Sequence, residues 1–337
     1  MKIKSLDGLR VVVALCIYTS HAHLMLRNFF SVSFFFMLSG FVLYYSESDR
    51  SIDFSIINNI KWSFKHIIRL YPLHILMFLF SIFIRYEWVE SLSTQDLLIK
   101  GFLNITLLQS LCLNPYTFNF CSWYISTLCI IYFFALPIIN YIKKSSYETE
   151  MLLAIIIIFQ YIVNYYFLKY EPHLSFIYSH PIYRITDVVL GILTAKLFLK
   201  YRKKNINVEL INISQLFIVV IFTIMLIASF NFRETTNYFS VLFVFLIFIQ
   251  AFDKGWLSGL LNNRYVQGVA KITFEFYMCH ELILFLLEKN ITPYLSINNQ
   301  TLKCLIVWFV GLPISLICAK VLNITFTKKI RGKFYSS

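Results

Sequence analysis

Residues 6–23 read LDGLRVVVALCIYTSHAH, an apolar run with one arginine, Arg10, near its start and two histidines, His21 and His23, at its end. A helix needs about 20 mostly apolar residues to cross the hydrocarbon core of a bilayer, and this run is nearly that long. Similar runs recur along the chain. They predict an all-α protein that is built from membrane-spanning helices.

Ten such runs can be identified, at residues 6–26, 34–45, 67–85, 123–142, 151–168, 182–198, 214–231, 238–252, 272–288 and 302–323. The chain has 337 residues, of which 58% are hydrophobic, more than one soluble core would hide. We therefore expect a polytopic membrane helix bundle of about ten transmembrane helices, forming a single domain over residues 1–337 without a soluble accessory domain. The run at 97–113 contains Lys100, Asn104 and Gln109, and we interpret it as a membrane-hugging or re-entrant stretch.

The net charge of +13 comes mostly from short loops between the apolar runs, which argues against a nucleic-acid-binding surface. The opposite loops hold only Arg27, Lys100, Lys169, Arg233 and Lys289. The positive-inside rule then places the more basic loops, and with them both termini, in the cytoplasm. Those loops contain Lys2, Lys4, Arg50, Lys61, Lys65, Lys143, Lys144, Lys200, Arg202, Lys203, Lys204, Lys254, Arg264, Lys271, Lys328, Lys329, Arg331 and Lys333.

Arg10 and His21 are eleven residues apart, and eleven steps of 100° bring a helix back to within about 20° of its start. Both side chains should therefore share one helix face, about 16 Å apart along the axis. Ionisable groups inside a membrane are costly, so each is a candidate functional residue. His21 is the candidate acid or base, because imidazole titrates near neutral pH. The alternative is that Arg10 reaches the headgroups and His21 only hydrogen-bonds a neighbouring helix.

A second polar cluster, Lys65, His66 and Arg69, precedes the third apolar run. Spacings of three and four residues predict that these side chains stack on one side of a helix. Such a cluster suits the phosphates of a nucleotide-bearing substrate, and it is equally typical of a topology anchor.

Two further groups lie inside apolar runs. Arg184 and Asp187 either neutralise each other or bind substrate, and Glu275 and His280, with the adjacent Glu281, are open to the same two interpretations. None of these spacings matches a metal motif, and we expect no metal site. Cys112 and Cys121 either pair in one exterior loop or remain free thiols.

Taken in order, these segments resemble the membrane acyltransferase-3 family, whose bacterial members O-acylate sugars of surface polysaccharides. The resemblance rests on LDGLR with the spacing from Arg10 to His21, on FFMLSGFVL at 35–43, on RLYPL at 69–73 and on SWYISTLCIIYFFALP at 122–137, which contains Trp123 and Ser126.

The resemblance implies that His21 is the essential histidine and that Arg10 is needed for activity. It also implies that the basic residues Lys65, His66 and Arg69 bind acyl-CoA. The chain departs from the family where a paired arginine is common and Lys65-His66 stands instead. A second departure is Leu128 and Cys129, where many members have glutamates.

We therefore expect a multi-pass protein of the bacterial cytoplasmic (inner) membrane that transfers an acetyl group from cytoplasmic acetyl-CoA to a glycan or lipid-linked sugar. Acetyl-CoA would be a co-substrate, with no permanently bound cofactor, and polysaccharide-biosynthesis proteins are possible partners. Trp123, Ser126, Arg184, Asp187, Glu275 and His280 are the candidate substrate-binding residues. The alternative is a transporter or flippase for a lipid-linked sugar, although the paired repeats that transporters often show are not evident.

Overall fold

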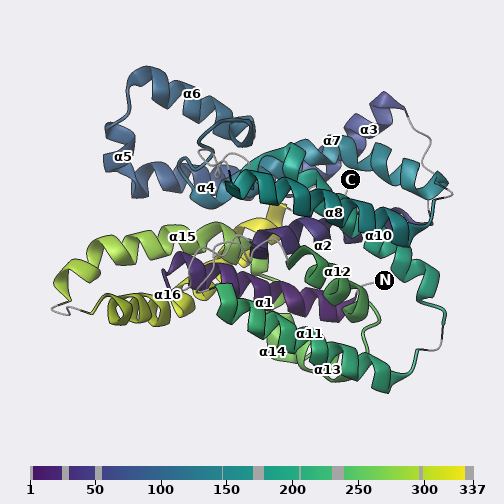
Figure 1. Ribbon diagram of the computed structural model, residues 1–337. Coiled ribbons are helices and arrows are strands. Elements are labelled where there is room, and N and C mark those ends of the chain that lie inside the picture. The colour runs from purple at the N-terminus through teal and green to yellow at the C-terminus, as the bar shows by residue number, and fades with distance from the viewer. Residues whose placement is uncertain are drawn as a thin grey trace.

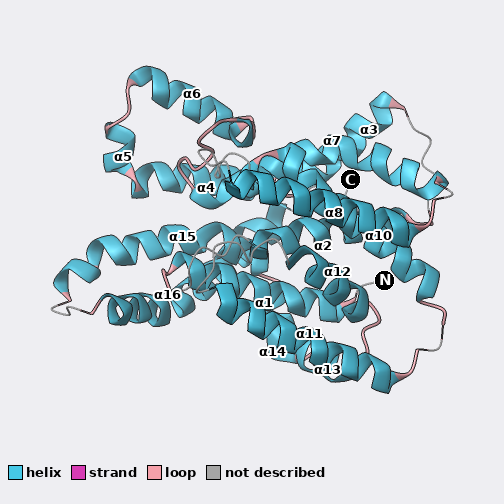
Figure 2. Ribbon diagram, in the orientation of Figure 1, coloured by secondary structure: helices cyan, strands magenta, loops and turns pink. Residues whose placement is uncertain are grey.

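The computed structural model describes residues 3–24, 30–49, 55–145, 147–169, 178–204, 206–229, 239–295 and 299–330. Every regular element within these ranges is a helix, as Figure 2 shows. The all-α class predicted from the apolar runs is therefore confirmed.

Each of the ten apolar runs corresponds to one long helix. These helices are α1 (Lys4–His21), α2 (Phe30–Glu47), α4 (Tyr71–Ile84), α7 (Trp123–Lys144), α8 (Thr149–Lys169), α10 (Pro181–Tyr201), α11 (Val208–Ser229), α12 (Phe239–Gln250), α15 (Thr273–Asn290) and α16 (Gln300–Leu322). Further helices of at most 12 residues connect them: α3 (Ile56–Ile67), α5 (Tyr86–Glu90), α6 (Thr94–Ile105), α13 (Gly255–Leu261) and α14 (Arg264–Ala270). Figure 1 shows α1, α2, α10 and α15 following roughly the same axis.

By length and apolar composition, two helices in the described ranges qualify as membrane spans, Phe120–Lys144 and Gln300–Ile330. Two bent pairs, α3 with α4 and α12 with α13, raise this number to four. Helices α1, α10 and α15 each carry several charged residues. Arg184 and Asp187 of α10 and Glu275 of α15 are buried, so hydropathy alone underestimates how apolar the outer faces of α10 and α15 are.

The tightest helix contact joins α2 and α10. A Cβ atom on Gly40 would overlap the carbonyl group of Val188, and one on Gly191 would overlap the carbonyl oxygen of Met37. Small residues let two backbones approach to this distance. Gly40 and Gly191 are therefore the residues that let α2 and α10 pack this closely.

Hydrogen bonds and ion pairs define the two ends of the bundle. At one end, the Gln267 side chain donates to the Lys4 carbonyl oxygen over 2.8 Å, and the Asn323 amide lies 3.5 Å from the Lys271 carbonyl oxygen. We call this the basic end. At the opposite end, which we call the histidine end, His21 closes α1 and Arg85 forms an ion pair with Glu281.

The predicted third helix is interrupted. Helix α3 ends at Ile67 and α4 begins at Tyr71, with a bend of 50° between them. Pro72 lies in the first turn of α4, and because proline has no backbone N–H it cannot make the helical hydrogen bond to the Ile68 carbonyl oxygen. Lys65 and His66 therefore lie at the end of α3 and Arg69 lies in the break, so the predicted stacking on one continuous helix is wrong.

Residues 97–113 do not form one continuous helix. Helix α6 ends at Ile105, and the chain continues through two short 3-10 turns, Gln109–Leu111 and Phe120–Ser122. Several side chains of this irregular segment are almost completely buried, namely Gln109, Ser110, Thr117, Phe118, Asn119, Cys121 and Ser122. Cys112 and Cys121 are both free thiols.

Candidate active site

A cavity of about 510 Å³ opens among α1, α2, α7, α15 and the end of α16. Its charged and amide side chains lie toward the basic end and are Asp7, Arg10, Lys271, Glu275, Asn323 and Lys328. Arg10 Nη1 lies 3.1 Å from Asp7 Oδ1, and the Asn323 amide donates to Glu275 Oε1 over 2.9 Å. The aromatic lining consists of Phe35, Tyr124, Tyr132, Phe274 and Tyr277.

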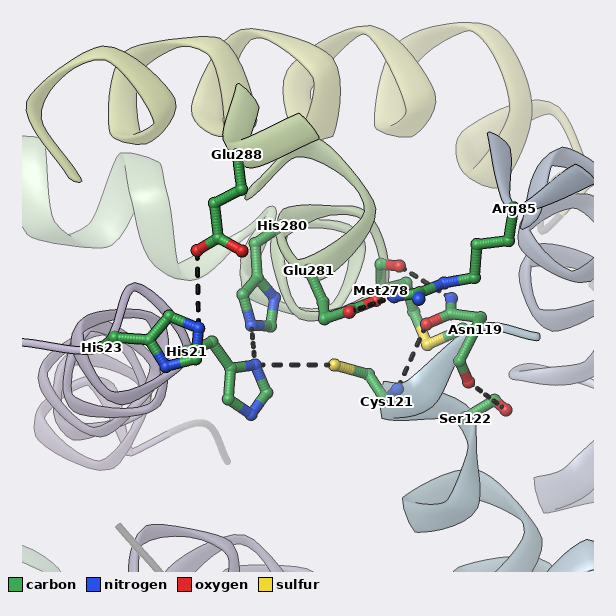
Figure 3. A network of polar contacts seen from close by, with 10 residues as sticks. All are labelled: His21, His23, Arg85, Asn119, Cys121, Ser122, Met278, His280, Glu281 and Glu288. Atoms are coloured by element: carbon green, nitrogen blue, oxygen red, sulfur yellow. Dashed lines mark hydrogen bonds and ion pairs between the residues drawn. The ribbon is translucent and has the colours of Figure 1, made fainter. Parts of the chain in front are cut away.

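A compact cluster of His21, His280 and Cys121 lies at the histidine end (Figure 3). His21 Nδ1 is 2.9 Å from His280 Nε2, and the two rings stack with centroids 5.0 Å apart. Cys121 Sγ is 4.0 Å from His21 Nδ1. His280 and Cys121 are buried, whereas His21 is partly exposed.

Helix termination fixes the position of His21. The backbone N–H of Leu24 bonds to the Thr19 carbonyl oxygen and that of His23 bonds to the Ser20 carbonyl oxygen, with His23 in the left-handed conformation at φ 57°. This pair of bonds is a Schellman motif, which ends the helix one residue after His21. His23 itself is exposed and lies 3.5 Å from Glu288.

Tyr277 links the cavity to the histidine cluster. Its side chain lines the cavity, its hydroxyl donates to the Cys121 carbonyl oxygen over 3.1 Å, and its ring centroid is 5.9 Å from that of His280. Tyr277 therefore forms part of the cavity wall and also contacts the cluster.

The chemistry of the cluster is compatible with a soft metal, because two imidazoles and one thiol offer atoms that all lie within 4.8 Å of one another. The spacing in this structure is that of a hydrogen bond instead. Two nitrogens on one tetrahedral zinc ion would be about 3.3 Å apart, whereas His21 Nδ1 and His280 Nε2 are 2.9 Å apart.

Comparison with known proteins identifies the family of this chain. A family profile described as an acyltransferase domain, Acyl_transf_3, matches residues 3–323. The chain belongs to the acyltransferase-3 family. The resemblance inferred from the sequence is thereby confirmed, and the chain is a membrane acyltransferase. No curated protein and no solved structure matches it.

In this acyltransferase, the predicted catalytic residues lie at the two ends of the site. Arg10 lines the cavity together with Glu275, and His21 contacts His280. Lys65, His66 and Arg69 are absent from the cavity lining, although Leu70 belongs to it. The centroid of the His66 ring lies 4.0 Å from that of Trp62 and 5.3 Å from that of Tyr132, with both pairs of rings tilted.

Trp123 and Ser126 pack within the acyltransferase. The Trp123 ring lies 5.0 Å from the ring of Tyr178. The Ser126 hydroxyl lies 2.7 Å from the Leu107 carbonyl oxygen and accepts a bond from the Ser110 backbone N–H over 3.1 Å. These contacts tie the irregular segment to α7.

Arg184 and Asp187 form an ion pair of 2.9 Å that is almost fully buried between helices. Arg184 also donates to the Ser33 hydroxyl over 2.7 Å, and Gln160 donates to Asp187 over 2.9 Å. The pair thus joins α10 to α2 and α8, an arrangement that stabilises helix packing without any ligand.

A second buried ion pair, Arg85 with Glu281, joins α4 to α15 near Cys121, and the Arg85 guanidinium lies between the rings of Phe120 and Phe285. Beyond it, Lys289 lies 2.8 Å from Glu87. The hydrogen bond from Lys289 lowers the pKa of the Glu87 carboxyl.

Lys271, Lys328, Cys121 and Tyr277 are the site residues that sequence reasoning missed. In the sequence, Lys271 and Lys328 are basic loop residues that no spacing distinguishes. Cys121 and Tyr277 come close to the histidines only through the packing of the irregular segment against α15.

Proposed function

We propose that this acyltransferase transfers an acetyl group from cytoplasmic acetyl-CoA to a hydroxyl of a cell-surface or lipid-linked glycan, with His21 as general base. The supporting observation is the cavity, which has Arg10, Lys271 and Lys328 at its basic end and Tyr277, next to the histidine cluster, at its inner wall. The site thus combines a cationic mouth with an aromatic interior and a basic imidazole beyond it.

Acetyl-CoA suits this arrangement because its two ends differ in chemistry. The phosphates of the nucleotide would bind the cations at the mouth, where charge-assisted hydrogen bonds are strong. The pantetheine arm would extend along the aromatic lining toward His21. Lys65 and Arg69, which lie close in the chain to the cavity residue Leu70, would strengthen the positive field around the mouth.

The transfer itself needs one base. His21 would remove the proton of the acceptor hydroxyl while the oxygen attacks the carbonyl carbon of the thioester. The bond from carbon to sulfur then breaks, the CoA thiolate leaves, and the proton returns to that sulfur. The product is an ester on the sugar, and the enzyme ends each turnover unchanged.

The direction of transfer follows from the proposed topology. Ten spans with both termini in the cytoplasm of a bacterial inner membrane place the basic end at the cytoplasmic face and the histidine end toward the exterior. Acetyl-CoA is then reached from inside and the glycan from outside, with partner proteins of polysaccharide synthesis supplying the acceptor.

The test uses purified protein in proteoliposomes with radiolabelled acetyl-CoA. The acceptor is surface glycan from cells that lack this chain, deacetylated with mild alkali. We expect label on the glycan and release of CoA thiol in equal amounts. Glycan movement across the bilayer without CoA release would support a flippase instead. If neither glycan movement nor CoA release occurred, both functions would be refuted.

A further inference from the structure

We propose that His280 is a positioning residue that holds His21 in one tautomer, with the proton on Nδ1 and the lone pair on Nε2. The inference rests on the proposed function, in which His21 is the base. It assigns to His280 a role different from the substrate contact expected from the sequence.

The hydrogen-bond partners of His280 determine its own tautomer. His280 Nδ1 lies 2.9 Å from the Tyr277 carbonyl oxygen and 3.1 Å from that of Phe276. Carbonyl oxygens only accept hydrogen bonds, so Nδ1 must carry the proton. A neutral imidazole has one N–H, and therefore His280 Nε2 presents a lone pair.

That lone pair determines the tautomer of His21. His21 Nδ1 lies 2.9 Å from His280 Nε2, and an acceptor at this distance requires a donor on the other atom. His21 Nδ1 therefore carries the proton, and Nε2 holds the lone pair that removes a proton from the acceptor. Figure 3 shows the second nitrogen of His21 pointing away from both His280 and Cys121.

The geometry also excludes a role for Cys121 as a nucleophile that His21 activates through Nδ1. The sulfur lies 4.0 Å from the nitrogen that already donates to His280. A nitrogen that carries a proton cannot accept one from the thiol. Cys121 is at most a weak second acceptor beside the main hydrogen bond.

Packing holds the His280 ring in place. His280 is fully buried, and its ring stacks on Phe276 with centroids 5.5 Å apart at an interplanar angle of 16°. Tyr18 covers it from α1 with a centroid distance of 6.1 Å, and the Tyr18 hydroxyl is occupied by a bond to the Trp308 carbonyl oxygen. Within the part of the chain that the structure describes, the titratable groups facing the two histidines are Tyr18, Cys121 and Tyr277, with His23 and Glu288 farther out.

Two nearly isosteric substitutions separate positioning from packing. His280→Gln places an amide oxygen near the former Nε2 and so keeps an acceptor for His21 Nδ1, whereas His280→Met fills a similar volume with only a weak acceptor. With acetyl-CoA and the deacetylated glycan, we expect kcat within about tenfold of wild type for the Gln variant. The Met variant should lose about 100-fold in kcat with little change in KM, because an unguided base often adopts the wrong tautomer.

A third substitution, His280→Glu, provides a signature that packing alone does not produce. A carboxylate beside Nδ1–H favours the charged imidazolium, so the acidic limb of the pH–rate profile should move to higher pH. Equal kcat values for the Gln and Met variants, or an acidic limb that stays in place in the Glu variant, would overturn the proposal.

Two controls keep this result separate from the proposed function. An inactive His21→Ala variant alongside a fully active His280→Met variant, at equal abundance, would refute positioning while leaving His21 as the base. One equivalent of zinc in the purified protein, lost in both Cys121→Ser and His280→Gln, would replace the hydrogen-bonded pair with a metal site and would also overturn the inference.

Discussion

At the scale of single residues, the decisive substitution is His21→Ala. Loss of a general base typically costs about 10² to 10⁴ in rate, and we expect that loss in kcat at unchanged membrane abundance. The matched control is His23→Asn, because His23 has a positive φ of 57° and asparagine tolerates that conformation better than alanine. Equal O-acetyl content of the surface glycan in cells producing either variant would show that His21 is structural.

The cations of the cavity mouth lead to a second prediction. Reversing the charge of Lys271 and Lys328 together should raise KM for acetyl-CoA by about tenfold, since each partly exposed ion pair contributes up to about 1 kcal/mol. Lys329→Glu is the control, because Lys329 is equally exposed but does not line the cavity. The measurement is the initial rate of thiol release at a series of acetyl-CoA concentrations. Lys65→Glu should raise KM for acetyl-CoA less than the double variant does. If Lys65→Glu alone raised KM as much as the double variant, the acetyl-CoA phosphates would bind at the end of α3 instead.

Sequence reasoning reached some of these residues and not others. His21 and Arg10 were predictable because each is a costly polar group in an apolar run and the helical period relates them. The contact of His21 with His280 joins residues 259 positions apart, and no local pattern contains that information. Lys271 and Lys328 were equally hidden, because a basic loop residue looks the same whether it faces a cavity or the headgroups.

At the scale of helices, the contact between α2 and α10 should be the least tolerant of added volume. Gly40→Ala would force the two backbones apart, and overpacking of this kind typically costs about 1 to 3 kcal/mol. We expect a lower midpoint of thermal unfolding in detergent, read from the monodisperse fraction after heating. Gly101→Ala in α6 has open space around the new methyl group and should be neutral or slightly stabilising. Identical midpoints for the two variants would contradict the tight contact.

Helix positions were predictable because hydrophobic periodicity is a local property, and all ten apolar runs coincide with helices. The break between α3 and α4 was also encoded in the sequence, in Pro72. Only the structure shows that the break separates Lys65 and His66, at the end of α3, from Arg69. The path of residues 107–122 was not predictable. It depends on buried polar contacts such as that of Asn119 with the Met278 carbonyl oxygen, which are made across the bundle.

At the scale of the whole molecule, the proposed topology of ten membrane spans makes a prediction about sidedness. Reporter fusions after residues 204 and 333 should report the cytoplasm, and a fusion near residue 94, just before α6, should report the exterior. An alkaline phosphatase and fluorescent protein pair at each position gives opposite signals and so controls for expression. Alkaline phosphatase activity without fluorescence for the fusions after residue 333 would place that residue outside and would require an odd number of spans.

The separation of the cavity mouth from His21 along α1 makes the proposed reaction electrogenic. The acceptor gives up its proton near the outer face, and the CoA thiol, which is mostly protonated at neutral pH because thiols have pKa values of about 8.5, is released inside. Each transfer would then move one positive charge inward.

A membrane potential of 100 mV, negative inside, is worth about 2.3 kcal/mol for a charge that crosses the whole membrane. In proteoliposomes, a potassium diffusion potential of that polarity should therefore speed acetyl transfer, and the reverse polarity should slow it. Equal rates would mean that the proton is lost to the exterior solution. If the predicted result is found, two sources of free energy drive acetylation of the cell surface, namely the thioester bond and the resting membrane potential of the cell.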